Sequence, residues 1–154
     1  MDKRAVIATF REVVSAKLDS LLDSLKDTQK RAQDAPGSNV THSDTSKFQL
    51  GNLALSLDLQ VQKAREVLSA ITGIQFHSDQ VACVGSLVEL SDCKTGQTKL
   101  YFIVLKGGGE TVVVEEKEIT MITAVSPLGR ASVSSKKGDR IFCNGRVYLV
   151  NDIE

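Results

Sequence analysis

The spacing of apolar residues changes near residue 73, and this change constrains the fold more than any other feature of the sequence. Before it, apolar residues recur every three or four positions, as on one face of a helix; after it, short runs rich in branched and aromatic residues alternate with turn signals. No Gly or Pro interrupts the first segment before Pro36 and Gly37. The sequence therefore predicts one long helix before residue 36, with this stripe: Ile7, Phe10, Val14, Leu18, Leu21, Leu25, Thr28 and Ala32.

A second helix is expected after the polar loop. Ser46 and Gln49 have the spacing of a capping box, and Gly73 suits a left-handed C-cap. The second stripe consists of Leu50, Leu53, Leu57, Val61, Ala64, Leu68 and Ile71. Two such stripes predict an antiparallel coiled-coil finger over residues 1–75, roughly 40 to 50 Å long at a rise of about 1.5 Å per residue. The alternative is that both helices only pack against the rest of the protein.

Residues 79–154 have the pattern of a small β domain. Strands are expected at 84–90, 99–105, 111–114, 118–124, 140–143 and 146–150, with Asn144-Gly145 as a tight hairpin turn. Ser126-Pro127 is typical of a helix start, and Gly138 of its end. The predicted fold class is α+β: the helical finger followed by a small twisted antiparallel sheet with one short helix.

Composition limits the function classes. Of 154 residues, 42% are hydrophobic, and 19 Lys plus Arg balance 19 Asp plus Glu. A neutral chain lacks the basic excess of a general nucleic-acid binder, so any RNA or DNA is expected to be presented by a partner. The three cysteines are widely spaced, and no apolar run approaches the roughly 18 residues of a spanning helix, so we expect a cytoplasmic protein.

The β half resembles a known family in a specific run of residues. Ser126-Pro127-Leu128-Gly129-Arg130-Ala131 is followed by Lys136-Lys137-Gly138-Asp139, after strands that begin at Val84-Gly85-Ser86 and contain Tyr101-Phe102-Ile103-Val104. The order and spacing resemble the C-terminal domain of the Gre transcript-cleavage factor family over residues 81 to 153. The predicted finger in front of this domain matches the helical hairpin of that family.

The resemblance implies a role for each part. In Gre factors the C-terminal domain has an FKBP-like fold without prolyl isomerase activity and docks on a coiled-coil rim beside the secondary channel of bacterial RNA polymerase, while the hairpin enters the channel. By resemblance, Ser126, Pro127, Leu128 and Gly129 are the docking candidates; the alternative is a helix start that only positions the sheet. The implied protein is a monomeric transcription elongation regulator that is not itself an enzyme and that meets RNA and DNA only within the transcription complex.

The fingertip departs from the family pattern. Active Gre factors carry an Asp and a Glu there that help to hold the second catalytic Mg²⁺ of the polymerase, whereas the carboxylates here are Asp34 and Asp44, with no Asp-x-x-Glu pair. Asp44 is the candidate ligand for that shared Mg²⁺, or else a helix cap; no cofactor of the protein's own is expected. Because the tip lacks this acidic pair, the sequence favours a factor that modulates transcription by occupying the channel over one that stimulates RNA cleavage.

By resemblance, three basic residues near the tip, Lys26, Lys30 and Arg31, are candidates for a Gre patch that holds extruded RNA. Asp23, Asp27 and Asp34 dilute this charge, which slightly favours the alternative of an ordinary solvated face. Two other function classes stay open. An FKBP-like sheet can host a prolyl isomerase or chaperone site, and the helical stripes can pair between chains as an adaptor or homodimer. The Pro36-Gly37 break favours a hairpin within one chain.

Overall fold

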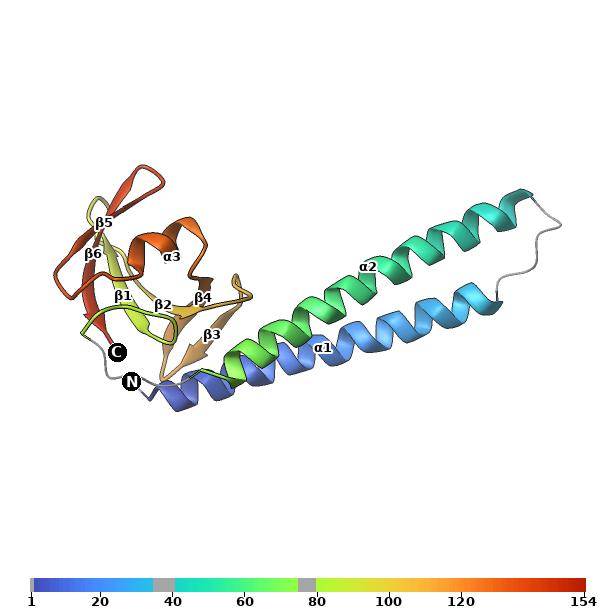
Figure 1. The fold of residues 1–154 in the computed structure, drawn as a ribbon, viewed down its shortest axis with the longest axis horizontal. Coiled ribbons are helices and arrows are strands. Elements are labelled where there is room, and N and C mark those ends of the chain that lie inside the picture. Colours follow the sequence, from blue (N-terminus) through green and yellow to red (C-terminus); the bar gives the residue numbers. More distant parts are fainter. Residues whose placement is uncertain (1, 35–40, 75–79) are drawn as a thin grey trace.

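The computed structural model describes residues 2–34, 41–74 and 80–154, with only the backbone described for 41–45. Two helices of 32 residues each, α1 (Lys3–Asp34) and α2 (Thr41–Thr72), lie side by side and project from a small sheet domain (Figure 1). At about 1.5 Å per residue, each helix spans about 48 Å. The predicted helical finger is confirmed.

The seam between α1 and α2 follows the predicted stripes with one exception. All eight residues of the α1 stripe are buried or half-buried, and so are six of the seven predicted for α2. Leu53 is 49% exposed, and Ala54 lies in the seam in its place. Small residues at the seam, Ala54, Ala64 and the buried Thr28, let the two backbones approach closely.

Both predicted caps of α2 are wrong, although the helix ends at Thr72, just before Gly73, as predicted. The helix begins at Thr41, so Ser46 lies inside it and is not its N-cap. At the other end Gly73 lacks the positive φ of a left-handed cap, and its N–H donates to the carbonyl of Ser69, continuing the helical pattern by one residue. The helix therefore ends without a left-handed glycine cap.

The sheet domain contains six strands in the order β3-β4-β2-β1-β6-β5. Their bounds are β1 (Leu87–Asp92), β2 (Thr98–Val104), β3 (Thr111–Val114), β4 (Lys117–Thr123), β5 (Arg140–Cys143) and β6 (Arg146–Ile153). Four neighbouring pairs are antiparallel, but β2 and β4 run parallel, so the prediction of a purely antiparallel sheet is wrong. The chain leaves β2, passes to β3 at the edge of the sheet, and turns back into β4. Strand β4 therefore lies between β3 and β2 and runs in the same direction as β2.

The connections follow the turn chemistry of the sequence. Asn144 and Gly145 both have positive φ, as the predicted tight turn between β5 and β6 requires. The short helix α3 (Pro127–Ser132) begins as expected but ends well before Gly138. It ends because the chain beyond it pairs with residues 81–82: Ser134 N–H donates to the carbonyl of Ala82, and Ala82 N–H donates to that of Ser135.

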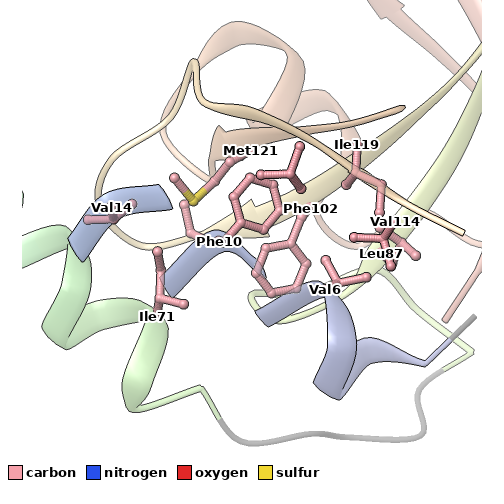
Figure 2. Packing of buried hydrophobic residues seen from close by; sticks show 11 residues of the cluster. Val6, Phe10, Val14, Ile71, Leu87, Phe102, Val114, Ile119 and Met121 are labelled. Atoms are coloured by element: carbon pink, nitrogen blue, oxygen red, sulfur yellow. The ribbon is translucent and has the colours of Figure 1, made fainter. Parts of the chain in front are cut away.

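Each face of the sheet carries its own hydrophobic core. One face packs against α3 and the segment before β1 through Ala82, Val88, Leu90, Ile103, Ile141 and Val150. The other packs against the root of the finger, where Val6, Phe10 and Val14 of α1 and Ile71 of α2 meet Leu87, Phe102, Val112, Val114, Ile119 and Met121 (Figure 2). Finger and sheet therefore share one core, although the sequence divides them at residues 75–79.

Phe10 is the centre of this shared core. Its ring is fully buried and stacks on that of Phe102, with centroids 5.8 Å apart and an interplanar angle of 15°. Two ion pairs flank the core at the surface: Lys17 Nζ lies 3.0 Å from Glu110 Oε1, and Lys106 Nζ lies 2.9 Å from Glu66 Oε2. Each joins a helix to the loop between β2 and β3, so both helices are fixed to the sheet.

Replacement of Phe10 by Ala tests this core. We expect Phe10→Ala to lower the free energy of unfolding by about 3 to 5 kcal/mol, because it removes a fully buried ring and its stacking partner's contact. Val13, which is 41% exposed on the same helix, is the matched position, and Val13→Ala is expected to stay within about 0.5 kcal/mol. Urea unfolding followed by circular dichroism measures both; similar small effects would contradict the assigned role of Phe10.

Candidate functional site: fingertip and sheet face

The tip residues are placed on the surface of the finger. Lys26, Lys30, Arg31 and Asp34 are all exposed on the last turns of α1. Arg31 pairs with Asp27 one turn earlier at 2.9 Å, so part of the positive charge is neutralised within the helix. Lys26 and Lys30, one helical turn apart, remain as two exposed cations. The RNA-proximal role of these three residues stays a prediction.

Asp44 lies in the first turn of α2, and its side chain is outside the described residues. Because the helix begins at Thr41, Asp44 is within the helix, so the alternative of a helix N-cap is wrong. Among the described residues no group of three or more His, Cys, Asp or Glu side chains could hold a metal ion. Of the two predicted tip carboxylates, only Asp34 has a described side chain. One carboxylate does not make a metal site, so the predicted contact with the polymerase Mg²⁺ stays a prediction.

The outer face of α2 carries an apolar row that sequence analysis did not single out. Phe48, Leu55 and Leu59 are 72%, 67% and 58% exposed. Their spacing of seven and four places them on one helical face, opposite the seam, in the projecting part of the finger. We call these three residues the outer stripe. The outer stripe gives the projecting part of α2 an exposed apolar strip.

The run Ser126 to Gly129 has mainly structural contacts. The Ser126 hydroxyl donates to the carbonyl of Thr123 at 2.7 Å and accepts from the N–H of Gly129 at 3.1 Å, which caps α3. Leu128 is half-buried in the core beneath α3. Pro127 is exposed beside Val125, which is 65% exposed. Pro127 is thus the member of the run best placed for docking, and the docking role itself stays a prediction.

Gly129 is required by a close approach of the backbone. A Cβ at this position would lie 1.9 Å from the carbonyl oxygen of Thr123, a distance that no side chain can adopt. The absence of a Cβ lets α3 lie directly on the end of β4. The motif that carried the family resemblance is therefore explained in part by the packing of this helix.

Sequence reasoning missed a polar pocket on the α3 side of the sheet. It has a volume of about 210 Å³ and is lined by Asp92, Gln97, Lys99, Tyr101, Arg146 and Tyr148, among others. We call it the tyrosine pocket. The pocket has no local sequence signal, because most of its lining residues come from three strands, β1, β2 and β6.

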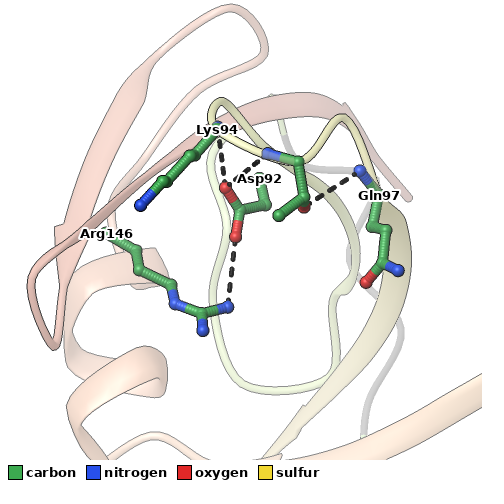
Figure 3. A network of polar contacts seen from close by, with 5 residues as sticks. Asp92, Lys94, Gln97 and Arg146 are labelled. Carbon is green, nitrogen blue, oxygen red and sulfur yellow. Dashed lines mark hydrogen bonds and ion pairs between the residues drawn. The ribbon is translucent and has the colours of Figure 1, made fainter.

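Asp92 organises one side of the tyrosine pocket (Figure 3). Its Oδ1 accepts from the N–H groups of Lys94 at 2.8 Å and Thr95 at 3.2 Å, and its Oδ2 accepts from Arg146 at 3.2 Å. The hydrogen bond from Lys94 above all, then that from Thr95 and the Arg146 charge, hold the pKa of Asp92 below its usual value against the opposing effect of burial. The carboxylate is therefore ionised at neutral pH, and both of its oxygens accept hydrogen bonds within the protein.

Comparison with known proteins gives a limited result. No family model matches the sequence, and no curated protein matches it. Among solved structures, the GreA factor homolog 1 (Gfh1) of Thermus thermophilus is 19% identical, with 94% of each chain covered and a TM-score of 0.38. Thermus aquaticus Gfh1 is 20% identical over 93% of this chain and 92% of that one, with a TM-score of 0.39.

A third structure, of the transcription factor Gfh1, is 21% identical over 94% of this chain and 92% of that one, with a TM-score of 0.37. All three are of the kind of protein that the sequence resembles. Identities near one fifth and TM-scores below 0.5 do not by themselves establish a family or an activity for this chain. Within the described ranges, no helix is both long and apolar enough to cross a membrane.

The two helical glycine positions provide a matched test of the packing around α3. Gly129→Ala is expected to lower the free energy of unfolding by at least about 2 kcal/mol, since the new methyl group would displace α3 from β4. Gly51→Ala, in an open position of α2 with nothing within 4 Å, is expected to raise it by up to about 1 kcal/mol. Thermal and urea unfolding of both variants measure the difference; a harmless Gly129→Ala would refute the close approach.

Proposed function

We propose that this protein binds bacterial RNA polymerase, docks through its sheet domain beside the secondary channel, and inserts its helical finger into that channel to modulate transcription elongation. The observation that carries this proposal is the shape of the hairpin. Its outer part projects well beyond the sheet domain (Figure 1). A projection that no part of the sheet domain supports is suited to a channel in another molecule. The proposed partner implies a cytoplasmic location.

The packing of the finger's base in the sheet core supports the proposal that the finger enters the channel with a fixed direction. Phe10 and Ile71 hold the two helices in the sheet core, and the Lys17–Glu110 and Lys106–Glu66 ion pairs flank them. A finger joined to the sheet by a flexible linker would lose conformational entropy when it entered a channel, and this loss would weaken binding. A finger packed in the sheet core has already lost that entropy on folding. The outer stripe then offers apolar contact to the channel wall.

The tip supports occupation of the channel over stimulation of cleavage. Asp34 and Asp44 are the tip carboxylates, and no second acid follows either at the spacing of active Gre factors. Lys26 and Lys30 are exposed where they can approach extruded RNA. We propose that the factor competes for the channel with factors that stimulate cleavage and supplies at most a weak Mg²⁺ ligand itself.

The prolyl isomerase alternative has less support. An isomerase site needs an apolar, aromatic-lined pocket, whereas the tyrosine pocket combines two phenols with the charges of Asp92, Lys99 and Arg146. Phe102 is fully buried in the core, and Phe142 is 69% exposed on the edge strand β5. The alternative of pairing between chains also has less support, because the predicted stripes pair within one chain.

Binding and competition test the proposal directly. We expect the full chain to retain core RNA polymerase in a pull-down, and to slow the cleavage of backtracked RNA that an active cleavage factor stimulates, in proportion to its concentration. Cleavage stimulated by this protein alone would mean that the tip does act on Mg²⁺, and loss of that activity in Asp44→Ala would assign the ligand. Failure to bind polymerase would refute the proposed function.

Substitution of the outer stripe tests insertion separately from docking. The double variant Leu55→Gln and Leu59→Gln is expected to fold with unchanged stability, because both side chains are exposed and Gln is a good helix former. It should weaken inhibition of cleavage by about tenfold, since two apolar contacts with the channel wall are lost. Leu105→Gln is the control, since Leu105 is 64% exposed just after β2; equal effects of both changes would refute a role of the stripe.

A further inference from the structure

We propose that the tyrosine pocket binds the carboxylate of an acidic side chain on the protein to which the sheet domain docks. This inference rests on the proposed function for the identity of that partner. The chemistry of the pocket carries it: hydrogen-bond donors and positive charge converge there in excess of acceptors. The sheet supplies Lys99 and Tyr101 from β2, Arg146 and Tyr148 from β6, and Asp92 from the end of β1.

The donors of the pocket are available to a ligand. In the part of the chain that the structure describes, the hydroxyls of Tyr101 and Tyr148 and the ammonium of Lys99 make no hydrogen bond and no ion pair. Tyr101 and Tyr148 are half-buried, pack against the core on the α3 side and line the pocket. Donors that make no hydrogen bond within the protein can donate to a ligand that displaces their solvent.

The one carboxylate that lines the pocket already accepts hydrogen bonds. Both oxygens of Asp92 are occupied by the N–H groups of Lys94 and Thr95 and by Arg146. Asp92 thus holds the Arg146 guanidinium in place but does not neutralise Lys99. Two positive side chains face one negative side chain, which leaves an excess of one positive charge for a ligand.

Protonation keeps the Tyr101 phenol as a donor. Burial above all, with the neighbouring Tyr148 and Cys143, raises the pKa of Tyr101 above its ordinary value, so its O–H is intact at neutral pH. A carboxylate, with two acceptor oxygens and one negative charge, matches this set of donors and the single excess charge. A dianionic phosphate would leave one charge without a partner.

The location of the pocket favours a side chain of a docked protein over a free molecule. The Arg146 side chain is 61% exposed and Lys99 is exposed, so the cationic rim faces solvent. A volume of about 210 Å³ is below the roughly 300 Å³ at which sites for whole small molecules begin. A single Glu or Asp side chain, delivered from a docked surface, fits these dimensions.

The ligand chemistry is tested first without polymerase. The probe is N-acetyl-glutamic acid α-amide, added to the isotope-labelled full chain and followed by amide NMR signals; N-acetyl-glutamine α-amide is its uncharged counterpart. We expect saturable shifts in β1, β2 and β6 around the pocket with the glutamic compound only. Equal shifts with the glutamine compound, or none with either, would overturn the inference.

Variants assign the binding groups. Tyr101→Phe removes one hydroxyl and keeps the ring, and Lys99→Met removes one charge and keeps most of the side chain; each is expected to weaken binding of the glutamic probe about tenfold. Lys117→Met is the control, because Lys117 is an exposed lysine that does not line this pocket. Unchanged probe binding in both pocket variants would overturn the assignment of these groups.

The same variants separate this inference from the proposed function. If the wild-type chain binds polymerase and Tyr101→Phe and Lys99→Met bind it about tenfold more weakly, the pocket contacts the partner. If all three bind equally, the partner role of the pocket is refuted while the proposed function stands. If the wild-type chain does not bind polymerase, the proposed function fails and with it the partner, and the NMR titration alone then decides whether the pocket takes a carboxylate.

Discussion

The stacking of Phe10 on Phe102 joins two elements that would otherwise be separate, a helical finger and a sheet. The direction of the finger depends on this contact and on the surrounding core, because a rotation of about 10° at the root would move a tip about 45 Å away by about 8 Å. Ile71 brings the second helix into the same core. With both helices held in the core, the described part of the finger has a defined direction relative to the sheet.

The sequence predicted the elements better than their pairing. Helical and alternating periods located both long helices and all six strands within a few residues, since these periods reflect local burial. The period could not decide between Leu53 and Ala54 for the seam, because both lie at a spacing of three or four from Leu50 and Leu57. Nor could it show that β4 lies parallel to β2, since that pairing follows from the place of β3 at the edge.

The candidate sites were harder to predict from the sequence than the fold was. The Ser126–Gly129 run was interpreted from its family resemblance, yet the requirement for Gly129 comes from the carbonyl of Thr123, which only the packed structure brings close. The tyrosine pocket joins strands far apart in the chain, so no local pattern marks it. Tyr101 and Tyr148 pack against the core on the α3 side and also line the pocket, a double role that the alternation of a strand does not reveal.

The seam of the finger differs along its length in a way that bears on its role. At the root the seam is closed by fully buried residues such as Phe10 and Ile71, whereas toward the tip it relies on half-buried leucines and on Thr28, whose hydroxyl bonds within its own helix to Ser24. Small seam residues keep the hairpin slender but bury little apolar surface. The described outer part of the finger therefore buries less apolar surface than its root, and in the proposed function contact of the outer stripe with the channel wall adds to that burial.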